Sequence, residues 1–154
     1  MKLLAFFLLF FGLCQKTYAN RLYTEITMDK AGGVGLGLDF EINPKPALGY
    51  GAYSRIFLEN AKEGQNGAIA LGGYFRPYIP GKVAAFFISP GFGLIRIDTG
   101  AGDEIVFGPS FMTGFNYKLG SSLIGFNITQ LYGWIGEVRG AIEQSFMISY
   151  VLQL

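Results

Sequence analysis

Large apolar residues recur at every second position through most of the sequence after residue 19. In residues 33–42 the even positions are all large and apolar, whereas the odd positions hold glycine, Asp39 and Glu41. Residues 105–118 and 141–154 alternate in the same way, with an interruption at Gln144. Side chains two positions apart share one face of a β-strand, whereas an amphipathic helix requires a period of 3.6. The alternation therefore predicts an all-β chain.

Eight segments carry this period: 21–29, 33–42, 47–58, 67–79, 83–98, 104–118, 122–135 and 141–154. Short connections with proline or glycine, at 43–46, 80–82 and 119–121, alternate with more charged ones at 29–30, 59–67, 99–104 and 136–140. Proline and glycine favour tight turns. The order of connections predicts a single domain, an antiparallel up-and-down meander with two different ends.

The two faces of each predicted strand differ in an unusual way. One face is rich in Leu, Ile and Phe, and the other holds mostly Gly, Ala, Ser and Asn with isolated charges. A soluble barrel has its polar face outside, whereas a membrane barrel turns its large apolar side chains to lipid. In lipid every backbone N–H and C=O must be paired, which requires closure. The sequence thus predicts an eight-stranded antiparallel up-and-down transmembrane β-barrel.

The first nineteen residues have the layout of a secretory signal peptide. Lys2 precedes an apolar run at 3–14, and Thr17 and Ala19 are small residues before a cut after position 19. The run is too short for a membrane helix, which needs about 20 apolar residues. Leu13 precedes Cys14, and a lipoprotein signal would place a small residue there. We predict a signal peptide over 1–19 and a barrel domain over 20–154.

Composition excludes several functional classes. Only 15% of residues are charged and the net charge is +1, so neither a disordered chain nor a nucleic-acid-binding one is expected. The sequence has no histidine, which removes histidine-based catalytic units and histidine-ligated metal sites. A single cysteine forms no intrachain disulfide. We predict no catalytic residue, no cofactor and no metal site.

Three patterns were weighed as possible sites. The alternating glycines at 33–38 lack the βαβ unit of a dinucleotide site. The stretch 98–104 places three carboxylates around two glycines, but without EF-hand spacing, which favours a solvated loop. An acid pair could be drawn from four inward carboxylates, Glu25, Asp39, Glu41 and Glu143. Unpaired charge in a dry lumen is costly, so a neutral network of ion pairs is the simpler interpretation.

This network predicts where charged side chains lie. Asp39, Glu41, Arg76 and Lys118 are expected inside the half that holds both termini. The other half is expected to hold the inward side chains of Arg55, Arg96 and Glu143, with Glu25 near the middle.

Aromatic residues and prolines add local predictions. Interfacial girdles are expected from residues near segment ends, namely Tyr50, Tyr117, Tyr132, Trp134 and Tyr150. Tyr23 and Tyr74 have inward parity and are expected to fill the lumen. Pro90 and Pro109 lie within segments and cannot donate to a ladder, so a bulge or a broken ladder is expected there.

At this level of pattern the chain resembles the small eight-stranded outer-membrane barrels of Gram-negative bacteria, of the OmpA-transmembrane-domain and OmpX type. The resemblance is carried by residues 1–19, the eight segments, and the alternation from Phe146 to Leu154. The family usually ends in an aromatic residue, whereas this chain ends in Leu154. The resemblance implies an outer-membrane location, contact with membrane lipid and lipopolysaccharide, a monomer, and recognition by the barrel assembly machinery.

The function expected from these patterns is that of a non-enzymatic outer-membrane barrel with a filled lumen and a role in envelope structure or surface interaction. One alternative is a membrane-embedded lipid-modifying enzyme. Another is a soluble lipocalin-like binding barrel in the periplasm.

Overall fold

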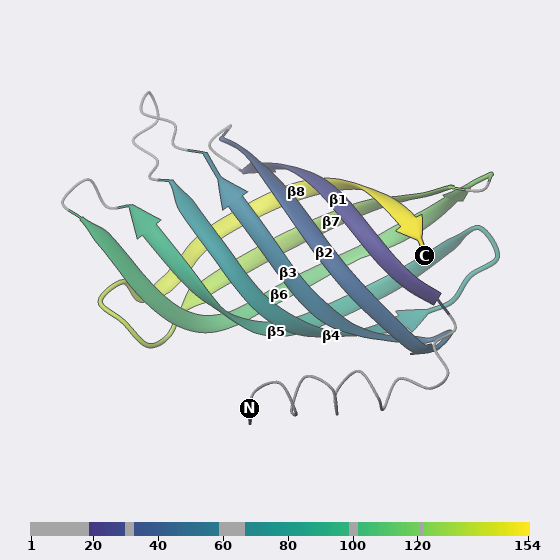
Figure 1. Ribbon diagram of the computed structural model, residues 1–154, viewed down its shortest axis with the longest axis horizontal. Helices are drawn as coiled ribbons and strands as arrows, with labels where there is room; N and C mark the ends of the chain where they lie inside the picture. The colour runs from purple at the N-terminus through teal and green to yellow at the C-terminus, as the bar shows by residue number, and fades with distance from the viewer. Residues whose placement is uncertain (1–18, 30–32, 59–66, 99–101, 121) are drawn as a thin grey trace, which may run out of the picture.

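The computed structural model describes residues 19–29, 33–58, 67–98, 102–120 and 122–154; residues 1–18 of the predicted signal peptide lie outside these ranges. They form eight strands (Figure 1): β1 (Ala19–Asp29), β2 (Val34–Lys45), β3 (Leu48–Phe57), β4 (Ala68–Ile79), β5 (Ala84–Asp98), β6 (Asp103–Leu119), β7 (Ser122–Gly133) and β8 (Gly140–Gln153). Each strand overlaps one predicted segment.

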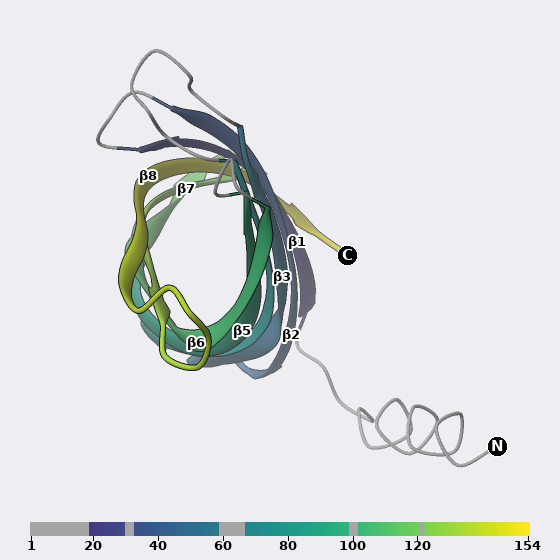
Figure 2. The ribbon, with the colours of Figure 1, turned by 90° about the vertical axis from the view of Figure 1, so that its left-hand side faces the viewer.

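The strands close into a single barrel in sequence order. Every neighbouring pair is antiparallel, and β1 pairs with β8 to complete the ring, which Figure 2 shows close to end-on. The prediction of an eight-stranded up-and-down barrel is confirmed. The described residues include no helix long and apolar enough to cross a membrane.

The barrel has two different ends, as predicted. The end that holds Ala19 and Gln153, called the terminal end here, carries connections 46–47, 80–83 and 120–121, on the right in Figure 1. The opposite end, called the loop end, carries connections 30–33, 58–67, 99–102 and 134–139. Gly120 has a φ of 61°. This left-handed conformation suits glycine in the two-residue turn between β6 and β7.

The predicted turn at 43–46 is wrong in its position, because β2 continues to Lys45. The register between β2 and β3 shifts between Ile42 and Lys45, so an irregular strand replaces most of the turn. The Asn43 side chain points inward and donates to Glu41 at 2.8 Å and to the Leu48 carbonyl at 3.3 Å. These bonds hold the segment in the barrel wall.

Pro90 and Pro109 lie beside interrupted ladders, as predicted. The pairing of β4 with β5 skips the positions around Pro77 and Pro90 and then resumes in the same register. The pairing of β6 with β7 stops beside Pro109 and continues only as an isolated bridge between Phe107 and Ile135. The ladder between β5 and β6 is continuous past both prolines. Proline lacks an N–H, so each interruption falls where a donor is missing.

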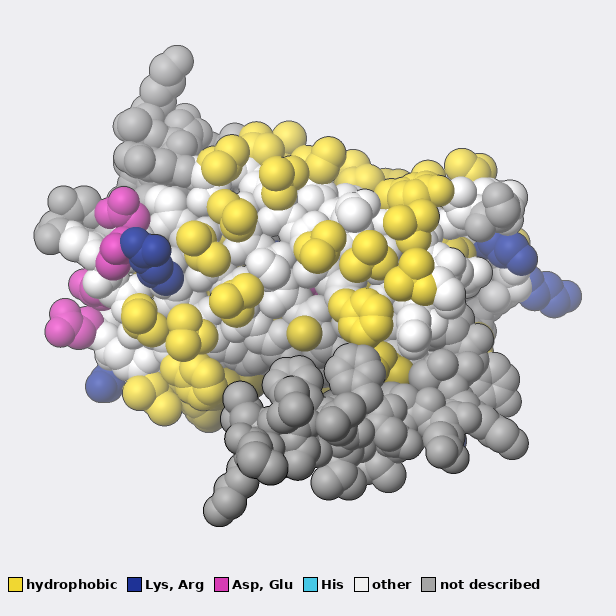
Figure 3. Space-filling view, in the orientation of Figure 1, with side chains coloured by type: hydrophobic (Ala, Val, Ile, Leu, Met, Phe, Trp, Pro, Cys, Tyr) yellow, Lys and Arg dark blue, Asp and Glu magenta, His cyan; other side chains and the backbone are white. Residues whose placement is uncertain are grey.

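The outward face of the barrel carries large apolar side chains on all eight strands. Figure 3 shows them spread over the face turned to the viewer. Exposed large residues, one from each strand in order, are Ile26, Leu36, Ile56, Leu71, Ile88, Phe111, Phe126 and Ile148. Strands of 10 to 17 residues are long enough to cross a bilayer, which takes about 9–11 residues in a tilted strand. The predicted inversion of faces is therefore present: the outward face is apolar, and charged and polar side chains are buried inside.

Aromatic residues lie where the girdle prediction places them. Outward aromatic residues near the terminal end are Tyr50, Tyr117 and Tyr150, and those near the loop end are Tyr132 and Trp134. Tyr23 and Tyr74 are buried in the lumen, as predicted.

Closure of the barrel depends on the last residues of β8. Deleting residues 152–154 removes the pairs that join Leu22 to Leu152 and Arg21 to Gln153, and it exposes an edge of β1. We expect this truncated chain to lose most of its compact, heat-modifiable form on unboiled gels. Deleting Leu154 alone removes only a backbone bond to the Asn20 carbonyl at 2.8 Å and serves as the control. Equal folding of wild type and the longer truncation would contradict this role.

Candidate functional site in the barrel interior

An alternating chain of buried charges crosses the lumen between β1, β2, β3 and β4. Arg55 contacts Glu25 at 3.2 Å and Asp39 at 3.0 Å. Arg76 contacts Asp39 at 3.0 Å and Glu41 at 3.0 Å. All five side chains are essentially inaccessible to solvent. Each guanidinium bridges two carboxylates, so the predicted network of ion pairs exists, and Arg76 has both of its expected partners.

Glu41 is the most heavily bonded carboxylate of this network. Tyr78 donates to its two oxygens at 2.7 and 2.8 Å, and Asn43 donates at 2.8 Å. Arg21, half-buried at the terminal end, lies 3.5 Å away and adds a third cation to the chain. The sequence analysis missed Tyr78, Asn43 and Arg21. Tyr78 is two positions from the inward Arg76 on β4, and Arg21 is two positions from the inward Tyr23 on β1. Both could therefore have been predicted to point inward from the alternation alone.

Aromatic rings enclose the guanidinium groups. Arg76 lies 4.2 Å from the ring centre of Tyr74, 4.7 Å from that of Phe87 and 4.8 Å from that of Tyr23. Arg55 lies 4.4 Å from the ring centre of Tyr53. Cation–π contacts are stronger where water is excluded. The rings and ion pairs together fill the part of the lumen beside β1 to β4.

One predicted inward charge faces outward, and another is inward but exposed. Arg96 is on the outward face, 53% exposed, and pairs with Asp103 at the loop end. The inward positions beside it are the buried side chains of Ile95 and Ile97. Lys118 keeps inward parity but lies at the open terminal end, where it is exposed. The remaining inward prediction, Glu143, is buried as expected.

The side of the loop half of the lumen formed by β3 to β7 is apolar, whereas β8 contributes the buried Glu143 and Ser145. A cluster of buried side chains from β3 to β7 fills the apolar side, including Phe57, Ile95, Ile97, Val106 and Leu131, and Val138 and Ile142 pack against the cluster. Large apolar groups occupy the space that an aqueous pore would need. In eight-stranded barrels the interior is just wide enough for side chains to fill it.

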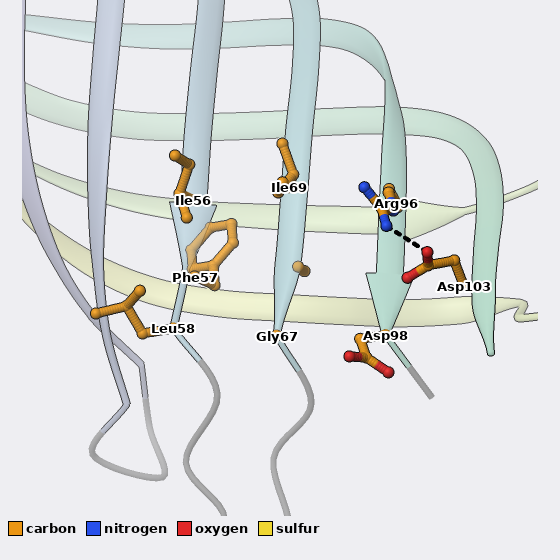
Figure 4. Close-up of a pocket in the computed structure, with 9 residues that line it drawn as sticks. Ile56, Phe57, Leu58, Gly67, Ile69, Arg96, Asp98 and Asp103 are labelled. Atoms are coloured by element: carbon orange, nitrogen blue, oxygen red, sulfur yellow. Dashed lines mark hydrogen bonds and ion pairs between the residues drawn. The ribbon is translucent and has the colours of Figure 1, made fainter. Parts of the chain in front are cut away.

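A pocket of about 260 Å³ lies at the loop end, on β3, β4, β5 and β6 (Figure 4). Ile56, Phe57 and Ile69 form its apolar wall, and the ion pair of Arg96 with Asp103 borders it. Stretch 98–104, weighed above as a calcium loop, lies partly outside the described residues. Within the described residues no group of three or more Asp, Glu or Cys side chains is placed to hold a metal ion.

Comparisons with solved structures show outer-membrane barrels with the same fold. The N-terminal β-barrel domain of Pseudomonas aeruginosa OprF matches with a TM-score of 0.64 and 10% identity, over 90% of this chain and 100% of that chain. Neisserial surface protein A matches with a TM-score of 0.58 and 10% identity, over 88% of this chain and 94% of that chain.

The outer membrane enzyme PagL also matches, with a TM-score of 0.54 and 10% identity, over 86% of this chain and 98% of that chain. No protein-family model matches the sequence, and no curated protein matches it. Identities of this size show the fold alone. The chain therefore has the fold of the small eight-stranded outer-membrane barrels, which confirms the resemblance read from its sequence.

Proposed function

We propose that the protein is a non-enzymatic integral barrel of the bacterial outer membrane that strengthens the envelope or presents its loop end to surface partners. The observation that carries this proposal is the combination of an apolar outer belt with a filled interior whose buried charges are held in ion pairs. A buried charge without a partner strongly destabilises a fold, so buried charges are expected in pairs. A continuous apolar outer belt is stable in contact with lipid.

Membrane lipid and lipopolysaccharide are then the surroundings of the belt, and the barrel assembly machinery is the partner that inserts the monomer. The two alternatives fit the molecule less well. A lipocalin-like barrel requires a polar outer face, and the outward residues here are large and apolar. An enzyme that transfers acyl groups through a serine requires that serine to be activated by a neighbouring base. The interior serines include Ser89, Ser110, Ser145 and Ser149, and the sequence supplies no histidine to activate them.

Membrane fractionation tests the proposed location. We expect the mature chain in the outer-membrane fraction, resistant to extraction by urea, and with faster gel mobility before boiling than after it. In planar bilayers we expect no porin-sized conductance, because side chains fill both halves of the lumen. Recovery as a detergent-free soluble protein in the periplasm would instead favour the lipocalin-like alternative, and hydrolysis or transfer of acyl chains by the pure protein would favour the enzyme.

A further inference from the structure

A cavity of about 140 Å³ opens at the terminal end of the lumen. Three cationic side chains line it: Arg21 from β1, Lys82 from the connection between β4 and β5, and Lys118 from β6. The amides of Asn116 and Gln153 complete its polar lining. Elements far apart in the sequence thus bring three positive charges to one opening.

Little negative charge offsets these cations. The carboxylate described beside them is that of Glu41, 3.5 Å from Arg21, and it already accepts bonds from Arg76 and Tyr78. Within the described part of the chain, Lys82 and Lys118 take part in none of the ion pairs. Both lysines are exposed. The opening therefore carries an excess of positive charge.

Arg21 adds a hydrogen-bond donor at this opening. Its guanidinium is held 5.1 Å from the ring centre of Tyr78, and its Nε is buried without a hydrogen-bond partner. Nη1 of the same guanidinium contacts Glu41 at 3.5 Å, so Nε is a donor that a group entering the cavity can use. The donor belongs to a side chain that lines the cavity.

We propose that this cavity binds a phosphate group. A phosphate carries up to two negative charges and several acceptor oxygens, which match two lysines and an arginine better than a single carboxylate does. The volume equals that of a few waters at about 30 Å³ each, enough for a phosphate with part of its ester. The group comes either from a soluble phosphate or from a phospholipid headgroup at the edge of the belt. This site is additional to the proposed function and depends only on the geometry of the opening.

Calorimetric titration of the folded protein in neutral detergent with inorganic phosphate, at constant ionic strength, tests the soluble source. We expect the double variant Lys82→Gln/Lys118→Gln to bind at least about tenfold more weakly, since charge-assisted hydrogen bonds are lost. Lys45→Gln is the matched control, because Lys45 is exposed at the same end but does not line the cavity. Gel mobility before boiling verifies folding, and Lys82→Gln alone replaces the double variant if that one misfolds.

Thermal unfolding in vesicles tests the headgroup source. Vesicles of phosphatidylcholine with phosphatidylglycerol are compared with phosphatidylcholine alone, for the same variants. A lysine-dependent stabilisation by phosphatidylglycerol, without binding of inorganic phosphate, assigns the site to a headgroup. Binding of inorganic phosphate that depends on Lys82 and Lys118 assigns it to a soluble phosphate. The proposal is overturned if neither probe acts on the wild type, or if Lys45→Gln loses as much as the double variant.

Discussion

Replacing Arg76 with alanine is expected to lower the free energy of unfolding by about 3–5 kcal/mol, the cost of breaking a buried ion pair by removing one partner. Arg76 is fully buried and joins Asp39 to Glu41, each at 3.0 Å. Without it, Asp39 keeps only Arg55, which also serves Glu25. Arg55 is then the remaining fully buried guanidinium of this network, against three buried carboxylates. The variant therefore leaves negative charge in the lumen without a partner.

Equilibrium unfolding in detergent or vesicles measures this loss, and Arg96→Ala is the matched control. Arg96 also forms an ion pair, with Asp103, but both side chains are about half exposed. An exposed pair contributes only about 0–1 kcal/mol, so the control variant should unfold almost as the wild type does. Similar losses for the two variants would show that burial does not govern the interior pairs, and a porin-sized current from Arg76→Ala would contradict a filled lumen.

The architecture could be predicted because one repeated signal determines it. Alternation over eight segments predicts the strands. The chemistry of the two faces predicts which side chains point to lipid and which point into the lumen. The same parity places Tyr23, Tyr74 and Arg76 in the lumen, where the structure has them. The order of short and charged connections then leaves an up-and-down barrel as the simplest closure.

Local departures from the alternation were harder to predict. Asn43 and Pro44 look like a turn in sequence, yet Asn43 bonds to Glu41 and keeps the segment in β2. Arg96 faces outward, contrary to the prediction, and the inward positions on either side of it are the apolar residues Ile95 and Ile97. A charge near the end of a strand can face outward at little cost, because the outer surface there meets water and headgroups.

The partners in the interior depend on three-dimensional register, which a single sequence does not specify. Glu41 lies on β2, and its donors Arg76 and Tyr78 lie on β4, two strands away. The inward parity of each residue is visible in the sequence, but the height at which they meet is set by the stagger of the strands. The terminal-end cavity was missed for the same reason.

Replacing Ile148 with arginine is expected to destabilise the folded barrel by about 2–4 kcal/mol, the cost of arginine on the lipid face near the bilayer midplane. Ile148 lies near the middle of β8, is 58% exposed, and pairs with Ile26 on β1 and Phe126 on β7. All three side chains face outward, so neither residue paired directly with position 148 offers the arginine a polar group.

Gln144→Arg is the matched control for Ile148→Arg, because Gln144 lies on the same face of β8 but nearer the loop end. Near the membrane interface an arginine costs only about 0–1 kcal/mol. Unfolding titrations in vesicles should therefore separate the two variants by more than their shared change in charge can explain. If the outer face contacted water instead, an arginine at position 148 and one at position 144 would both be solvated. Equal stabilities of the two variants would therefore show that the apolar face of the barrel does not contact lipid.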